Sequence, residues 1–144
     1  MKTYQKLVDE AVKALKNAYV PTTSGWRFGS AVLTAKGNIY SSGQYFSDTY
    51  SLTLHAEQAA LAHASAHGEH DVVAIAAVST EDPKEQAYCH PCGMCKQLLF
   101  EHAKRSSHDI DVVMANHKGE YIVKKISELT PYPWPTEEYY KTSK

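Results

Sequence analysis

Two short stretches of the sequence bring together side chains that could do chemistry. His55 and Glu57 stand two positions apart inside the otherwise apolar segment LTLHAEQAAL, and Cys92 and Cys95 stand three apart, directly after Pro91. A neutral imidazole and two thiolates are ligands that zinc prefers, and three protein ligands leave a fourth coordination position for water. The pattern therefore indicates a catalytic rather than a structural zinc site.

Glu57 has a separate use in such a site. On a regular helix, at about 100° per residue, it lies about 200° around from His55, so it need not bind the same ion. Zinc lowers the pKa of its water to about 7 and so provides a nucleophile at neutral pH. A carboxylate nearby can take a proton from that water and pass it to the substrate. We therefore predict a hydrolytic site in which Glu57 is the proton shuttle.

Two predicted helices present these side chains. The apolar spacing predicts one helix from about residue 54 to 66, ended by Gly68, and another over residues 92–106. Each pair of polar residues then lies in the first turn of its helix, after a loop or a strand. The positive ends of the two helix dipoles would meet at the metal and favour thiolate over thiol.

The remaining elements predict a sheet beneath these helices. Apolar runs at 71–80 and 109–116 are typical of strands covered on both faces, and the helix between them predicts a parallel pair. Residues 26–43 hold two strand-like runs around the turn AKGN, which indicates a β-hairpin. Residues 4–19 have the spacing of an amphipathic helix, and YIVKKI predicts an antiparallel last strand. The expected fold class is α/β, a three-layer α/β/α arrangement with a mixed sheet of about five strands and helices on both faces.

Length and charge limit the possible functions. The chain of 144 residues, 43% hydrophobic, has the size of a single domain, which we expect to span residues 1–144. A net charge of −1 provides no basic excess to neutralise phosphates, so we expect a small-molecule partner and no nucleic acid. No apolar run reaches the roughly 20 residues of a membrane span, and the N-terminus lacks the apolar core of a signal peptide. We therefore expect a cytoplasmic protein that does not bind membranes.

The three cysteines all lie in the segment CHPCGMC. An odd number cannot form a disulfide framework, so metal binding or catalysis is the better use. Cys89 could add a fourth ligand, since Cys89-x-x-Cys92-x-x-Cys95 also has metal spacing, and the zinc site would then be purely structural. The sequence leaves both arrangements open.

The two motifs together match the H-x-E and P-C-x-x-C signature of zinc-dependent deaminases. The wider sequence resembles the cytidine deaminase family of free-nucleoside enzymes, which includes members of the blasticidin S deaminase type. The similar segments, within roughly residues 4–134, are WRFGSAVLT, HAEQAAL, PCGMCKQLL and ISELTPYPW. The resemblance implies the family's fold and one Zn²⁺ per chain on His55, Cys92 and Cys95. It also implies that Glu57 catalyses conversion of a cytidine-type aminopyrimidine nucleoside to the uridine-type product and ammonia.

One departure from the family concerns charge at the metal. Many small members use three cysteines and place an arginine after the glutamate, whereas this chain has His55 as the first ligand and Gln58 after Glu57. Three thiolates around Zn²⁺ carry a net charge of −1, while one histidine and two thiolates are neutral. The chain therefore has no need of the compensating arginine.

A second departure concerns the substrate. The family usually binds the ribose hydroxyls with an N-x-E triplet, but residues 42–51, SGQYFSDTYS, contain neither Asn nor Glu. Gln44, Ser47 or Asp48 could bind a hydroxyl group instead. Trp26 stands where the family has a phenylalanine beside the pyrimidine, so the pocket would be reshaped. These changes suggest a different amine as the alternative substrate, such as a blasticidin S-type nucleoside antibiotic or a modified base.

Further expectations rest on the resemblance. Ala56 is expected to contact the substrate, and Tyr132 and Trp134 are our candidates for a lid, because the family's aromatic tail can close over a neighbouring subunit's active site. Small members are typically homotetramers, so we expect a homo-oligomer, with a role in pyrimidine salvage or in detoxification.

Other interpretations remain open at this point. A non-catalytic binding module stapled by zinc is one, although a structural site has no use for the Glu57 carboxylate. Editing of a base within RNA or DNA would need a cationic channel, of which the sequence gives no sign. His63 and His67, four positions apart, are either a second metal site or two solvated side chains near a helix end.

Overall fold

The computed structural model describes residues 3–21, 26–80 and 88–142 of the chain. Its strands form one five-stranded sheet in the order β2-β1-β3-β4-β5, in which β3 and β4 are parallel and the other neighbours antiparallel. The strands are β1 Phe28–Thr34, β2 Ile39–Gly43, β3 Val72–Ser79, β4 Asp111–Ala115 and β5 Tyr121–Lys125. The predicted mixed sheet, with its hairpin and its parallel pair, is confirmed.

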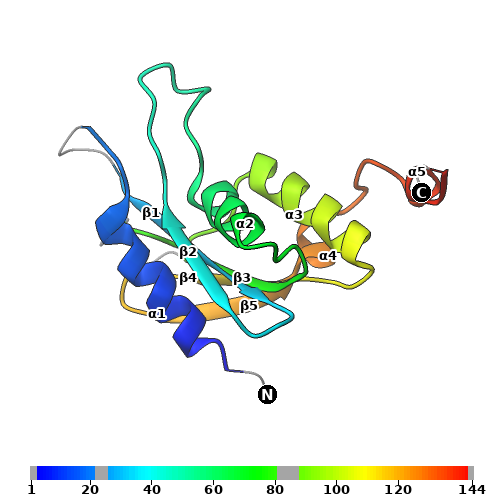
Figure 1. The fold of residues 1–144 in the computed structure, drawn as a ribbon, viewed down its shortest axis with the longest axis horizontal. Coiled ribbons are helices and arrows are strands. Elements are labelled where there is room, and N and C mark those ends of the chain that lie inside the picture. Colours follow the sequence, from blue (N-terminus) through cyan, green and yellow to red (C-terminus); the bar gives the residue numbers. More distant parts are fainter. Residues whose placement is uncertain (1–2, 22–25, 81–87, 143–144) are drawn as a thin grey trace.

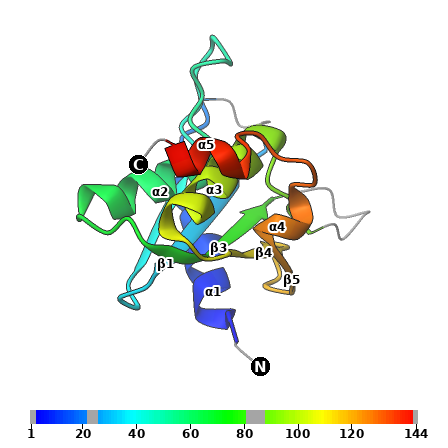
Figure 2. The same cartoon turned by 90° about the vertical axis from the view of Figure 1, so that its right-hand side faces the viewer.

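Helices cover both faces of this sheet. Figure 1 shows α1 on one face and α2 and α3 side by side on the other, and Figure 2 shows the sheet between them. The helices are α1 Gln5–Ala14, continued by the 3-10 turn η1 Leu15–Asn17, α2 Ala56–Ala66, α3 Gly93–Ser106, α4 Ile126–Leu129 and α5 Glu137–Thr142. The three-layer α/β/α class is therefore confirmed. Within the described residues, no helix is long and apolar enough to cross a membrane.

Two apolar clusters hold the layers together. On one face Leu7 and Val8 of α1 pack with Val113 of β4, and on the other Leu99 of α3 packs with Ile75 of β3. Burying a side chain of this size contributes about 1.5–3 kcal/mol. Strands β3 and β4 meet both clusters, which explains why their sequences are apolar without alternation.

The start of α2 differs from the sequence prediction. Leu54 is extended, because its backbone exchanges two hydrogen bonds of 2.9 Å with Tyr45 in the loop that leaves β2. His55 is also extended, at φ −69° and ψ 152°, and is the N-cap of a helix that begins at Ala56. The loop between β2 and α2 extends away from the body of the molecule in Figure 1. His55 thus stands at the junction between this loop and the helix.

A buried carboxylate fixes the other end of α2 to the hairpin. Glu69 accepts hydrogen bonds from the Thr34 hydroxyl, from Asn38 Nδ2 at 2.7 Å and from the Tyr40 hydroxyl at 2.8 Å. These bonds, led by the one from Thr34, hold the pKa of Glu69 below its ordinary value. Ionised Glu69 therefore ties the turn after α2 to β1 and β2.

This arrangement predicts an acid-sensitive contribution to stability. Because the folded-state pKa is lowered, Glu69 stabilises the fold above its unfolded pKa of about 4.3, and the contribution is lost as the pH falls through the folded-state value. Glu69→Gln is therefore expected to lower the free energy of unfolding at pH 7. In acid, the free energies of unfolding of the variant and the parent should be closer to each other. Urea unfolding at both pH values measures this. A difference in the free energy of unfolding between variant and parent that grew in acid would contradict the role given to Glu69.

Candidate active site

The N-terminal ends of α2 and α3 bring the predicted metal ligands together. His55 Nδ1 lies 3.3 Å from Cys92 Sγ and 3.4 Å from Cys95 Sγ. Cys92 is the extended N-cap of α3, at φ −69° and ψ 172°, and Cys95 lies in the first turn. Among the described residues, these form the one group of three or more side chains whose ligand atoms, all within 4.8 Å of one another, could hold a metal ion.

The donor set fits zinc. Tetrahedral bonds of about 2.05 Å to nitrogen and about 2.3 Å to sulfur place those atoms about 3.6 Å apart, close to the separations found here. Burial, reinforced by the Glu57 carboxylate, raises the pKa of the Cys95 thiol. Zinc binding must therefore displace a proton from this thiol, which makes the affinity dependent on pH. Cys89 is not part of the group, although it lines the cavity beside it.

Glu57 lies against this group. Its side chain is 7% exposed and hydrogen-bonds with Cys95. Burial raises the pKa of Glu57 above its ordinary value, although that hydrogen bond and His55 oppose the shift. Because His55 precedes the helix, the angle expected for two residues of one regular helix does not apply to this pair. Glu57, His55 and Cys92 line the same cavity.

The cavity has a volume of about 190 Å³. Its walls come from β1, the β2–α2 loop, the start of α2 and the loop before α3. They are formed by Phe28, Gln44, Thr53, His55, Ala56, Glu57, Cys89, His90 and Cys92. Gln44 and Ala56 were among the predicted substrate contacts. The sequence predicts Cys89 only as a possible fourth metal ligand and His90 only as a pocket-edge or surface residue. Sequence reasoning did not select Phe28 or Thr53, although Phe28 follows Trp26 at the two-residue spacing of a strand face.

Gln44 is a polar side chain of this wall whose amide makes two hydrogen bonds to the backbone. Its Oε1 accepts the Phe28 backbone N–H, and its Nε2 donates to the Trp26 carbonyl at 3.0 Å. The amide is therefore tied to the backbone of the segment entering β1. Its remaining N–H and lone pair can face a ligand.

Three other predicted contacts lie outside the cavity wall. Trp26 is 58% exposed, and Asp48 is exposed in the loop. The Ser47 backbone donates to the Thr53 hydroxyl at 2.9 Å, and the Ser47 hydroxyl accepts the Thr49 N–H. Ser47 thus organises the loop, because its polar groups are used within it.

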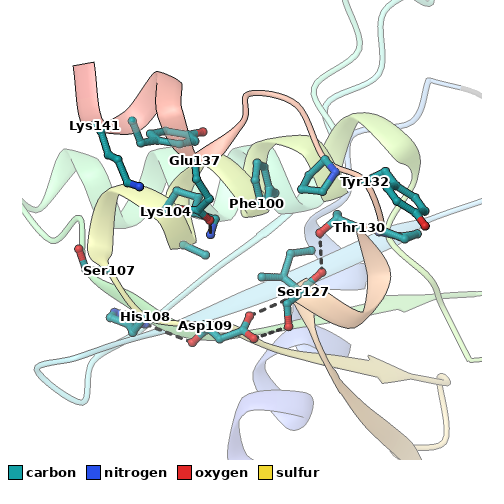
Figure 3. Close-up of a pocket in the computed structure, with 15 residues that line it drawn as sticks. Phe100, Lys104, Ser107, His108, Asp109, Ser127, Thr130, Tyr132, Glu137 and Lys141 are labelled. Atoms are coloured by element: carbon teal, nitrogen blue, oxygen red, sulfur yellow. Dashed lines mark hydrogen bonds and ion pairs between the residues drawn. The ribbon is translucent and has the colours of Figure 1, made fainter. Parts of the chain in front are cut away.

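The predicted lid residues are also distant from their own chain's cavity. Figure 3 shows Tyr132 on the edge of a larger cavity of about 890 Å³ between α3, α4 and the C-terminal segment. The Trp134 carbonyl accepts a hydrogen bond of 2.7 Å from Gln97 Nε2, which holds the tail on α3. Neither aromatic residue lines the cavity that holds Glu57.

Gln58, which follows the buried glutamate, fixes the backbone of His55, a predicted metal ligand. Its Oε1 accepts the His55 N–H at 3.0 Å, as in a capping box. Gln58→Ala should lower the free energy of unfolding of the zinc-free protein by about 0.5–1.5 kcal/mol, because that N–H loses its partner. Urea denaturation measures the loss, with Gln58→Glu as the control that keeps an acceptor. Equal losses in both variants would rule out the cap as the cause.

The α/β/α fold and a carboxylate beside one imidazole and two thiols define a zinc-dependent hydrolytic enzyme. Residues 1–107 match the family model described as the cytidine and deoxycytidylate deaminase zinc-binding region. The chain belongs to this family of zinc enzymes.

Individual relatives agree with this assignment. A cytidine deaminase of Halalkalibacterium halodurans is 35% identical over 134 residues, which are 93% of this chain and 96% of the relative. The crystal structure of a cytidine deaminase from Burkholderia pseudomallei has a TM-score of 0.80 at 28% identity, covering 92% of this chain and all of that one. The enzyme from Mycobacterium leprae gives 0.71 at 27% identity, covering 91% of this chain and 99% of that one. The chain therefore matches these relatives over nearly their whole length.

Proposed function

We propose that the protein is a zinc-dependent deaminase that hydrolyses a cytidine-type aminopyrimidine nucleoside to the uridine-type product and ammonia. The observation that carries the proposal is the buried Glu57 carboxylate beside the His55, Cys92 and Cys95 donor set, at a cavity that Glu57, His55 and Cys92 line. Relatives named cytidine deaminases cover nearly the whole chain. In a non-catalytic binding module whose zinc only stabilises the fold, the Glu57 carboxylate would have no function.

The residues of the site divide the chemistry between them. His55, Cys92 and Cys95 would hold one Zn²⁺, which would supply the Lewis acidity that makes water a nucleophile at neutral pH. Glu57 takes a proton from the attacking water, delivers it to the ring nitrogen and then carries the second proton to the departing amine. The C4–O bond forms and the C4–N bond breaks, so both water protons end on the products. Glu57 can serve both transfers because its carboxylate lies beside the metal-binding group and lines the same cavity.

A second candidate is the same reaction on a different amine, such as a blasticidin S-type antibiotic or a modified base. Its support is the β2–α2 loop, which stands where the family has its ribose-binding triplet. Gln44 is tied to the backbone of residues 26 and 28, and the groups of Ser47 and Thr53 bond with each other. Few free polar groups therefore remain here for two ribose hydroxyls.

Ammonia release by the zinc-loaded protein separates these candidates. We would test cytidine, deoxycytidine, cytosine, blasticidin S and adenosine, with Glu57→Gln as the blank. Rapid turnover of cytidine supports the first proposal and makes Gln44 the next residue to replace. Activity only on an amine other than cytidine would support the proposed reaction but not the proposed substrate. No ammonia release from any compound of the panel would count against both candidate functions.

We also propose a cytoplasmic homotetramer, acting in pyrimidine salvage or in detoxification. Apolar side chains around the β2–α2 loop are exposed in the single chain, including Tyr19, Tyr45 and Leu52 at 52%, 58% and 67%. Burial of such a patch against another copy would stabilise an assembly. Trp26, Tyr132 and Trp134, which lie outside their own chain's cavity, would serve a site only across such a contact. Light scattering after size-exclusion chromatography tests this, and a monomeric mass would exclude it.

A further inference from the structure

Two histidines lie at the C-terminal end of α2, the opposite end of the helix from Glu57. His63 and His67 stand one turn apart, and both are exposed. Their ring centroids are 5.1 Å apart. They belong to neither of the two cavities described above.

The hydrogen bonds of the two rings determine which nitrogens are available. His63 Nδ1 lies 3.0 Å from the Ser41 carbonyl oxygen of β2, and His67 Nδ1 lies 3.0 Å from the His63 carbonyl oxygen. A carbonyl only accepts hydrogen bonds, so each Nδ1 carries the proton of the neutral ring, and each Nε2 keeps its lone pair. Metal-binding histidines are commonly held in this way, with one ring nitrogen donating to a backbone carbonyl.

The spacing of the rings suits one shared ion. With bonds of about 2.1 Å to each Nε2, and an angle of about 90–110° at the ion, the two ring centroids lie about 4.6–5.3 Å apart. The distance of 5.1 Å between His63 and His67 falls within this range. The ring separation is therefore compatible with a shared ion.

Neighbouring side chains keep the two rings in place. The Tyr40 ring packs edge-on against His63, at 5.2 Å between centroids, and tilted against His67, at 4.8 Å. The Tyr40 hydroxyl is in turn bonded to Glu69. The histidines thus rest on a fixed aromatic ring, which lowers the entropy lost when both bind one ion.

We propose that His63 and His67 form a second, surface metal site for a divalent late transition ion such as Zn²⁺, Ni²⁺ or Cu²⁺, with water in the remaining positions. Imidazole nitrogen suits these ions, and the hard ions Mg²⁺ and Ca²⁺ prefer oxygen. The site has two neutral ligands, so it binds more weakly than the site of His55, Cys92 and Cys95. It does not depend on the reaction proposed above.

Isothermal titration calorimetry of the zinc-loaded protein with Ni²⁺ tests the proposal. We expect one further equivalent to bind, with His63→Ala and His67→Ala each weakening the association at least tenfold. His117→Ala, which removes an exposed histidine from the β4–β5 turn, should bind like the parent. Zinc content must stay at one per chain during the titration, so that exchange at the first site is not counted.

Two results would overturn the proposal. One is the lack of a further equivalent on the parent, and the other is its retention by both alanine variants. Mg²⁺ in place of Ni²⁺ should give no binding. The alanine variants should keep the parent's thermal unfolding temperature without added metal and its rate of ammonia release. That rate separates failure at this site from failure of the proposed reaction.

Discussion

The Glu57→Gln variant is expected to keep one zinc ion per chain and to lose turnover by about 10²–10⁴-fold. Glutamine has nearly the same shape as glutamate, so the packing beside Cys95 should remain. It cannot accept the proton of the attacking water, so both proton transfers assigned to Glu57 fail. Ammonia release gives the rate, and elemental analysis of the same sample gives the zinc content.

The chain offers a matched control for this substitution. Glu69 has a similar exposed fraction, 8% against 7% for Glu57, but it bonds to the hairpin and not to the metal group. Glu69→Gln should therefore keep its turnover at neutral pH. Full activity of Glu57→Gln would remove that residue from the mechanism. Loss of zinc together with activity would assign it a structural role instead.

The second large effect is expected from His55→Ala, which should lose both zinc and activity. Only two ligands would remain, and burial favours the protonated thiol of one of them, Cys95. After dialysis against a mild chelator we expect one zinc per chain in the parent and close to none in the variant, with His117→Ala as the control. A variant that kept its zinc would show that another side chain supplies the third ligand.

Much of this architecture could be predicted from the sequence because its signals are local. The apolar runs that became β3 and β4 are buried on both faces, and such runs predict strands directly. The pairing of His55 with Cys92 and Cys95 followed from the ligand chemistry of two motifs. The parallel β3–β4 pair followed from the helix between them.

The start of α2 and the cavity wall could not be predicted in the same way. Leu54 has helical spacing with the residues after it, but its pairing with Tyr45 makes it extended. Phe28 of β1 and Thr53 of the β2–α2 loop line the same cavity although they are distant in the sequence. Trp26, chosen from its place in the family pattern, is exposed instead. These positions depend on contacts between segments distant in the chain, which periodicity does not report.

The positions of His55 and Cys92 affect which part of the protein unfolds first. The two residues are 37 apart in sequence, and each is the N-cap of a helix. An ion bound to both residues closes a loop of that length. By the chain-entropy argument for cross-links, this closure contributes about 4 kcal/mol to the free energy of unfolding. Removal of zinc should therefore let α2 and α3 separate before the sheet unfolds. Amide hydrogen exchange should then accelerate in these two helices, while β3 and β4 remain protected.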